Sequence, residues 1–250
     1  MTDTRPQGVF VSLSATRAII FANGLLADPA AAHAAIRPAD LLIAADGGLH
    51  HLHGLGLRPH VLIGDLDSIG PDEARQMEAG GVRVTRFSPR KDQTDLELAV
   101  QLAIAEGATD ILIFGALGAR WDHTLANLLL LAHPDFRAAR LRLVDGPQQI
   151  YLIQGRAVIE GQPGDTVSLI ALTGDARGVT TEGLEYPLTR GRLAFGSTLG
   201  VSNVLLGATA NVQVEEGLLA CIVIDTSSET ARGETARAAS VRQPVAERLL

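Results

Sequence analysis

The sequence has a single cysteine, Cys221, and a single lysine, Lys91, among its 250 residues. One cysteine excludes disulfide bonds within the chain and metal sites made of several thiolates, and its position in the apolar run 218–224 predicts a buried strand residue. Lys91 follows Arg90 rather than a glycine, so the chain lacks the Gly-Lys-Ser/Thr loop that binds phosphates in many nucleotide-binding proteins. A nucleotide, if one binds, must be held by other groups.

Long apolar runs are also absent from the sequence. The nearest, residues 125–132, falls far short of the roughly 18 residues that a membrane-spanning helix needs, and the N-terminus lacks the basic flank and apolar segment of an export signal. We therefore expect a cytoplasmic protein with no membrane partner. The formal net charge of -7 disfavours nucleic acid as the main partner and is compatible with a cationic substrate.

The first 145 residues alternate short apolar runs with helix-like stretches, which predicts an α/β fold with a doubly wound, mostly parallel sheet. The clearest helix begins at Thr94, because Thr94 and Glu97 have the spacing of a capping box and apolar residues follow at helical intervals as far as Gly107. We expect strands at residues 18–21, 41–45, 61–63, 82–85, 111–114 and 141–144.

From about Gln149 the pattern changes to short alternating segments separated by glycines, such as residues 167–170, 201–205 and 212–214. This pattern predicts an all-β antiparallel sandwich or barrel. The turn dipeptide Gly146-Pro147 marks the boundary between the two patterns. We therefore expect an α/β domain at residues 1–146, an all-β domain at residues 147–225 and a polar tail at residues 226–250.

Acidic residues follow three of the predicted strands, where ligands of doubly wound sheets bind. They are Asp46, the pair Asp65 and Asp67, and the pair Asp92 and Asp95. Asp65 and Asp67 are two residues apart in extended chain, so their side chains point to the same side. Carboxylates this close repel one another, and a hard cation such as Mg²⁺ would neutralise them and leave coordination positions for substrate phosphates. The alternative interpretation is that aspartates simply favour turns and helix caps after strands.

Residues 115–123 join the fifth predicted strand to a helix that continues through Asn127. Gly115 and Gly118 let backbone amides approach an anion, and the N-terminus of the helix adds a favourable partial charge. Arg120, in the same segment, can bind a phosphoryl oxygen. The alternative for an isolated arginine is a surface salt bridge.

Three histidines, His50, His51 and His53, form a cluster in another predicted helix. No cysteine and no well-spaced acidic residue completes a zinc site with them. We expect them to lie on a solvated helix face and assign them no chemistry.

Six short motifs follow one another along the chain. They are Ala-Asp-Gly-Gly at 45–48, Gly-Asp-Leu-Asp-Ser at 64–68, Lys-Asp-Gln-Thr-Asp at 91–95, Gly-Ala-Arg-Trp-Asp-His at 118–123 with Asn127, Thr-Thr-Glu-Gly-Leu-Glu-Tyr-Pro-Leu at 180–188, and Ser-Asn at 202–203. In this order they resemble the motifs of the thiamine pyrophosphokinase family. Each is short, but their order and spacing over roughly residues 17–225 make the set specific. One departure is Ala119, where many members of that family have a second glycine. The resemblance implies an α/β domain, a C-terminal β-sandwich, and a homodimer whose thiamine pocket draws on both chains.

The resemblance also implies the reaction, in which the hydroxyethyl oxygen of thiamine attacks the β-phosphorus of ATP to give thiamine diphosphate and AMP. Asp65, Asp67 and Asp92 would then bind Mg²⁺ on the triphosphate. Arg120 would brace the transferring group and Asp122 would orient the incoming hydroxyl, so the catalytic residues would be Asp67, Asp92, Arg120 and Asp122. Such transfers depend mainly on positioning and charge stabilisation, which this set can supply.

The remaining family positions would line the two substrate sites. Ser202 and Asn203 would hydrogen-bond the aminopyrimidine of thiamine, and Tyr186 would pack on its cationic thiazolium ring. The residues that would bind ATP are Asp46, Gly47, Ser68, Thr94, Asp95, Gly118, His123 and Asn127.

Other functions are compatible with parts of the same pattern. A related pyrophosphokinase acting on another small alcohol, such as a hydroxymethylpterin, would use the same phosphate machinery without needing Tyr186, Ser202 or Asn203. A module that binds ATP without turnover would not need Arg120 and Asp122. A hydrolase would use the same aspartates to activate water.

Overall fold

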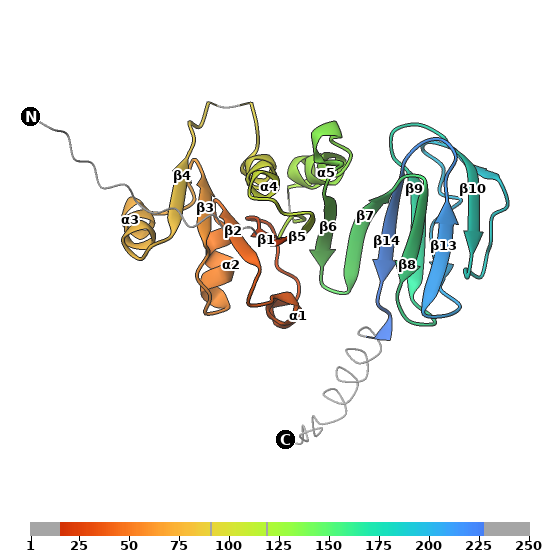
Figure 1. Ribbon diagram of the computed structural model, residues 1–250, viewed down its shortest axis with the longest axis horizontal. Coiled ribbons are helices and arrows are strands. Elements are labelled where there is room, and N and C mark those ends of the chain that lie inside the picture. Colours follow the sequence, from red (N-terminus) through yellow and green to blue (C-terminus); the bar gives the residue numbers. More distant parts are fainter. Residues whose placement is uncertain (1–15, 91, 119, 228–250) are drawn as a thin grey trace, which may run out of the picture. The chain divides into compact units, whose positions relative to one another are not determined.

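The computed structural model describes residues 16–90, 92–118 and 120–227 (Figure 1). The chain divides into two compact units between Leu141 and Arg142, inside strand β6 (Arg140–Asp145). The expected domain limits at residues 146 and 225 stay predictions. Apart from Thr226 and Ser227, the expected tail lies outside the described residues.

The first unit is a parallel sheet covered by helices, as expected from the sequence. The sheet has the strand order β5-β1-β2-β3-β4, and each neighbouring pair is parallel. Its elements are β1 (Arg17–Phe21), α1 (Pro29–Ala35), β2 (Leu41–Ala45), α2 (Gly48–Gly54), β3 (Val61–Gly64), α3 (Pro71–Ala79), β4 (Arg83–Arg86), α4 (Asp95–Ala105), β5 (Asp110–Phe114), α5 (Trp121–Leu130) and the short 3-10 helix η1 (Pro134–Phe136).

The strand order contains one reversal, between β1 and β5. The chain moves from β1 to β4 in one direction and then returns through α4 to the other side of β1. With right-handed crossovers, this return places α4 on the opposite face of the sheet from α1, α2 and α3. α2 packs on β1 and β2, and α4 packs on β1, β2 and β3 (Figure 1). The sheet is therefore doubly wound, with its switch point beside β1.

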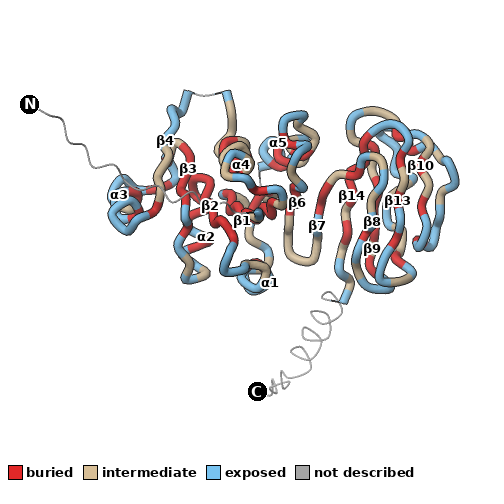
Figure 2. Tube along the Cα trace, viewed as in Figure 1, coloured by how far each residue is buried: buried red, intermediate tan, exposed pale blue. Residues whose placement is uncertain are grey.

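Burial on both faces explains why these strands are uninterrupted apolar runs. All residues of β2 and β3 and four of the five residues of β1 are buried. These strands are largely red, the colour of buried residues, in Figure 2. The helix expected from Thr94 is confirmed as α4, with the Thr94 hydroxyl accepting a hydrogen bond from the Glu97 amide at 3.2 Å. This cap fixes the turn that carries Asp95 to the carboxyl end of the sheet.

The second unit is an antiparallel β-sandwich. One sheet has the order β12-β9-β14-β7-β6 and the other β11-β10-β13-β8. Besides β6, the strands are β7 (Gln148–Ile153), β8 (Arg156–Glu160), β9 (Thr166–Ala171), β10 (Ala176–Glu182), β11 (Gly191–Leu193), β12 (Asn203–Val204), β13 (Thr209–Gln213) and β14 (Leu219–Ile224).

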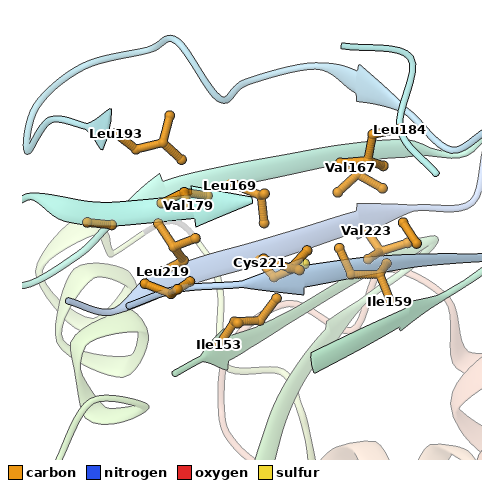
Figure 3. Packing of buried hydrophobic residues seen from close by; sticks show 14 of the residues in the cluster. Ile153, Ile159, Val167, Leu169, Val179, Leu184, Leu193, Leu219, Cys221 and Val223 are labelled. Atoms are coloured by element: carbon orange, nitrogen blue, oxygen red, sulfur yellow. The ribbon is translucent and has the colours of Figure 1, made fainter. Parts of the chain in front are cut away.

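The core of the sandwich is made of aliphatic side chains from both sheets (Figure 3). Ile159 and Val179 come from one sheet, and Val167 and Cys221 from the other. The expectation that Cys221 is a buried strand residue is confirmed, and burial raises the pKa of its thiol to about 11. At neutral pH Cys221 is therefore a protonated core residue.

The strand expected at residues 201–205 is shorter than predicted, because only Asn203 and Val204 form β12. Ser202 has a φ of 61°, in the left-handed region, which breaks the extended conformation just before Asn203. Within the part of the chain that the structure describes, no helix is long and apolar enough to cross a membrane.

Candidate active site

The carboxyl ends of the parallel strands meet at a cavity of about 1040 Å³ in the first unit. Its walls come from the segments that follow all five strands, β1 to β5, on both sides of the switch point, where ligands of doubly wound sheets bind. Ten of the expected site residues line it: Asp46, Asp65, Asp67, Ser68, Thr94, Asp95, Gly118, Arg120, His123 and Asn127. Gly47, Asp92 and Asp122 are not among the lining residues.

Three carboxylates form the polar centre of this cavity. Asp46, Asp65 and Asp67 each offer an oxygen, and these oxygens lie within 4.8 Å of one another. Asp65 Oδ1 accepts a hydrogen bond from the Asp67 amide at 3.3 Å. Asp46 is only 6% exposed, and its Oδ1 is buried with no hydrogen-bond partner among the described residues. A buried, unpartnered carboxylate oxygen beside two further carboxylates is strongly unfavourable unless a cation binds there.

The backbone of this group is strained in a way that points to function. Asp46 and Leu66 have φ values of 46° and 61°, which are rare for residues other than glycine. Leu66 lies between the two aspartates that follow β3, and Asp46 directly follows β2. Non-glycine residues in this conformation concentrate at ligand sites, where the surrounding structure holds them in place.

The structure brings together a different set of aspartates from the set that the sequence assigns to the metal. Asp46 joins Asp65 and Asp67, whereas Asp92 is exposed and lies outside this group. Asp95 lines the cavity, and its Oδ1 is 3.0 Å from where a Cβ on Gly64 would lie. The role of Asp92 as a metal ligand and catalytic residue stays a prediction.

The glycine-containing loop at residues 115–118 is held rigidly from behind. All four of its carbonyls accept hydrogen bonds from the protein: two from the amides of Gly24 and Leu25 at 2.7 and 2.8 Å, and two from the side chains of Asn127 and Thr124 at 2.7 and 3.4 Å. A Cβ on Gly24 would overlap two of these carbonyls, so only glycine allows the approach. Because its carbonyls are engaged in these bonds, the loop is suited to offer amides to an anion, except that of Gly118, which donates to Thr124 Oγ1 at 3.2 Å.

Arg120 and Asp122 follow this loop and are bound to each other. Arg120 Nη2 donates to Asp122 Oδ2 at 2.5 Å, and both side chains are largely exposed. The hydrogen bond from the Arg120 guanidinium lowers the pKa of Asp122 to about 2, with help from the backbone at His123. Asp122 is therefore a carboxylate throughout the neutral range and carries no proton to donate there.

One of the three clustered histidines departs from the solvated helix face expected for them. His51 is half-buried, and its Nε2 is 2.8 Å from the carbonyl oxygen of Gly24. A carbonyl only accepts, so this nitrogen carries the proton. His51 thus supports the loop after β1, while His53 is exposed and pairs with Glu73 at 3.2 Å.

Asn23 is a cavity residue that the sequence analysis missed. It lines the cavity just after β1, and its Nδ2 donates to Ser68 Oγ at 3.2 Å. The signal available in the sequence is a polar side chain two positions after the strand expected at residues 18–21.

The second unit has a smaller pocket of about 250 Å³, which Tyr186 and Asn203 help to line. The Asn203 side chain holds the backbone of Tyr186, accepting from its amide at 3.0 Å and donating to its carbonyl at 2.8 Å. Ser202 is not among the lining residues, and its amide donates to Ser168 Oγ at 3.0 Å. Leu169, Pro187 and Leu199 contribute to the apolar part of the wall.

Comparison with known proteins connects both units to one family. A family model described as "Thiamin pyrophosphokinase, catalytic domain" matches residues 32–143, and one described as "Thiamin pyrophosphokinase, vitamin B1 binding domain" matches residues 156–219. The chain is 33% identical over 184 residues to a thiamine pyrophosphokinase of Bacillus subtilis, covering 73% of this chain and 86% of the relative. It is 29% identical to thiamine pyrophosphokinase 1 of Arabidopsis thaliana, covering 74% and 79%.

Solved structures agree with the sequence comparison. The crystal structure of thiamine pyrophosphokinase from Bacillus subtilis superposes with a TM-score of 0.75 at 30% identity, covering 84% of this chain and 99% of that one. That from Geobacillus thermodenitrificans gives a TM-score of 0.73 at 26% identity, covering 85% and 99%.

The fold, the cavity and these matches define an enzyme class, the diphosphotransferases that combine an α/β catalytic unit with a substrate-binding β-sandwich. The chain belongs to the thiamine pyrophosphokinase family. Its function is therefore that of a thiamine pyrophosphokinase. None of the families and relatives above supports a pterin pyrophosphokinase or a module without turnover.

Proposed function

We propose that the chain transfers the diphosphate of ATP to the hydroxyethyl group of thiamine in a Mg²⁺-dependent reaction that yields thiamine diphosphate and AMP. The observation that carries the proposal is the group Asp46, Asp65 and Asp67, with a buried, unpartnered carboxylate oxygen on Asp46, at the wall of a large cavity. Oxygen ligands of this kind suit Mg²⁺. When bound there, Mg²⁺ would offset the negative charge of the polyphosphate.

The same wall supports binding of the phosphates of ATP. The loop at residues 115–118 has its carbonyls turned into hydrogen bonds with the protein, and α5 begins a few residues later with its N-terminal partial positive charge. Arg120 lines the cavity and can donate to a phosphoryl oxygen as charge develops on it. Ser68, Thr94 and His123 supply further polar groups.

We assign Asp122 an orienting role toward the acceptor hydroxyl. In the transfer, the bond from the thiamine oxygen to the β-phosphorus forms while the bond from the β-phosphorus to the bridging α,β-oxygen breaks. AMP leaves with that electron pair, and the proton of the thiamine hydroxyl is released to solvent. A carboxylate with a pKa of about 2 is a weak base. It can nevertheless accept a hydrogen bond from the attacking hydroxyl and fix its direction.

The pocket of the second unit supports thiamine as the acceptor. Apolar side chains and Tyr186 surround it, and an aromatic ring favours a cationic ring such as thiazolium. Asn203 keeps Tyr186 in position and has a second amide hydrogen for the aminopyrimidine. Ser202 would need to turn toward the pocket to contribute.

We also propose a homodimer whose thiamine site draws on both chains, and a cytoplasmic location. The dimer rests on the family resemblance of the sequence motifs. The location is supported by the use of ATP and by a lone, buried cysteine, which suits a reducing compartment.

The direct test is AMP formation by the purified protein with ATP, thiamine and Mg²⁺, with the products identified by mass spectrometry. We expect AMP and thiamine diphosphate in equal amounts, and neither product after chelation of the divalent ion. ATP consumption without thiamine, or transfer to a hydroxymethylpterin at a higher kcat/KM, would overturn the assignment. Asp67→Asn should remove turnover while far-UV circular dichroism stays unchanged.

A further inference from the structure

Asn23, in the segment after β1, contacts the segments that follow two other strands. It follows β1, its Nδ2 lies 3.2 Å from Ser68 Oγ beyond β3, and its carboxamide packs against the Cα of Gly47 beyond β2. A Cβ on Gly47 would overlap the carboxamide of Asn23, so the contact requires glycine there. Asn23 therefore lies between Gly47, which follows Asp46 in the sequence, and Ser68, which follows Asp67.

Two hydrogen bonds in series connect Asn23 through Ser68 to the carboxylate of Asp67. Ser68 Oγ donates its single proton to Asp67 Oδ1 at 3.2 Å, so the same oxygen can only accept from Asn23. The amide nitrogen of Asn23 must therefore face Ser68, which fixes the orientation of the carboxamide. Each member of the series is held by the one before it.

This series of hydrogen bonds determines which oxygen of Asp67 accepts a hydrogen bond from the protein. Oδ1 accepts from Ser68, and one oxygen of the same carboxylate lies within 4.8 Å of oxygens of Asp46 and Asp65. Asp67 and Ser68 are both exposed side chains, so packing alone does not fix their rotamers. Hydrogen bonds from outside the ligand shell commonly orient ligating carboxylates and raise metal affinity.

We propose that Asn23 is a positioning residue that orients Asp67 for the divalent ion through the hydroxyl of Ser68. This proposal deepens the proposed function and depends on its assignment of the ion to Asp46, Asp65 and Asp67. Asn23 acts before any nucleotide is present, because every contact in the series is made within the protein.

The test measures Mn²⁺ affinity by electron paramagnetic resonance, without substrates. Asn23→Leu keeps the branching of the side chain and removes the donor, and we expect it to weaken Mn²⁺ binding about tenfold, as is typical when a group that orients a metal ligand is lost. Ser68→Ala should have the same effect. The double variant should bind no more weakly than Ser68→Ala alone, because the two residues act in series. Asn211→Leu, at an exposed asparagine of β13, is the matched control and should bind like the wild type.

Several outcomes separate this inference from the proposed function. If Asp65→Asn loses Mn²⁺ binding while Asn23→Leu or Ser68→Ala retains it, the positioning role is refuted and the metal assignment stands. If Asp65→Asn binds like the wild type, the metal assignment itself fails. Multiplicative losses in the double variant would show independent roles and overturn the series. Ser68→Ala, an exposed change, keeps the question open to test if Asn23→Leu does not fold.

Discussion

Asp46 combines burial, an unpartnered oxygen and two neighbouring carboxylates, so its charge opposes folding when no cation is bound. We predict that Asp46→Asn lowers kcat/KM by roughly a hundredfold or more, because loss of a ligand should cost at least the upper range seen for loss of groups that only orient ligands. In metal-free buffer the same variant should unfold at a temperature equal to or above that of the wild type, because repulsion is relieved. Steady-state kinetics and differential scanning calorimetry measure the two effects.

The control for Asp46→Asn is Asp72→Asn, an exposed aspartate in the first turn of α3. It should leave kcat/KM unchanged. A large loss of stability in metal-free Asp46→Asn would mean that the carboxylate is satisfied in the folded protein, contrary to the interpretation given above.

His60 gives the first unit a pH dependence of its own. The residue is exposed, but its Nδ1 accepts a hydrogen bond from the Leu42 amide at 2.9 Å, and partial desolvation of the ring lowers its pKa. The unfolded chain, with a pKa of about 6.5, takes up the proton first as the pH falls. The free energy of unfolding should therefore be at its full value above about pH 6.5 and decline below it until the folded-state pKa is passed.

The variant His60→Asn separates this contribution from others. The amide oxygen of asparagine can replace Nδ1 as acceptor without titrating. Urea unfolding between pH 5 and 8 should show a shallower decline in the variant than in the wild type. Equal slopes in the two proteins would contradict the assignment to His60.

At the scale of elements, α5 supports the loop at residues 115–118, which we propose binds the phosphates of ATP. Asn127 is buried and donates to the carbonyl of Ala116 at 2.7 Å. Asn127→Ala would leave that carbonyl without its donor, at a cost of about 1–3 kcal/mol in the free energy of unfolding. We also expect a higher KM for ATP with a smaller change for thiamine. Urea unfolding and steady-state kinetics test both.

Thr124→Ser is the conservative counterpart on the same helix, since it retains the hydroxyl that bonds to Gly118. It should cost less stability than Asn127→Ala. An Asn127→Ala protein with unchanged stability and an unchanged KM for ATP would argue that the loop is held without α5.

The elements of the first unit were largely predictable, because strands buried on both faces are continuous apolar runs. The expected strand at residues 41–45 matches β2, and Thr94 caps α4 as expected. The membership of the acidic group was less predictable. Asp46 joins Asp65 through a left-handed backbone conformation, and Asp92 lies apart, and neither fact follows from residue spacing. The strand expected at residues 201–205 begins only at Asn203 for the same reason, because Ser202 has a left-handed φ of 61°.

At the scale of the whole molecule, the proposed dimer predicts complementation between inactive subunits. Asp67→Asn disables the α/β contribution to a site, and Asn203→Ala disables the sandwich contribution. If each site takes one contribution from each chain, a mixed dimer has one intact site and one site with both defects. An equal mixture of the two variants, unfolded and refolded together, should regain about a quarter of wild-type activity, since half of the dimers are mixed.

If the mixture has no more activity than the two variants measured separately, the hypothesis that each site is shared between two chains is contradicted. Size-exclusion chromatography with light scattering must show dimers in both variants and in the mixture. A monomeric wild-type protein would refute the dimer directly.

The lone cysteine in the sandwich core can be used to measure local opening of the second unit by thiol labelling. Cys221 is buried, and with a pKa of about 11 its thiol is almost wholly protonated at neutral pH. Maleimides react with the exposed thiolate, so the native chain should stay unlabelled and the labelling rate should follow how often β14 is released. A cysteine placed at any surface position could then carry a fluorophore with no need to remove the natural one.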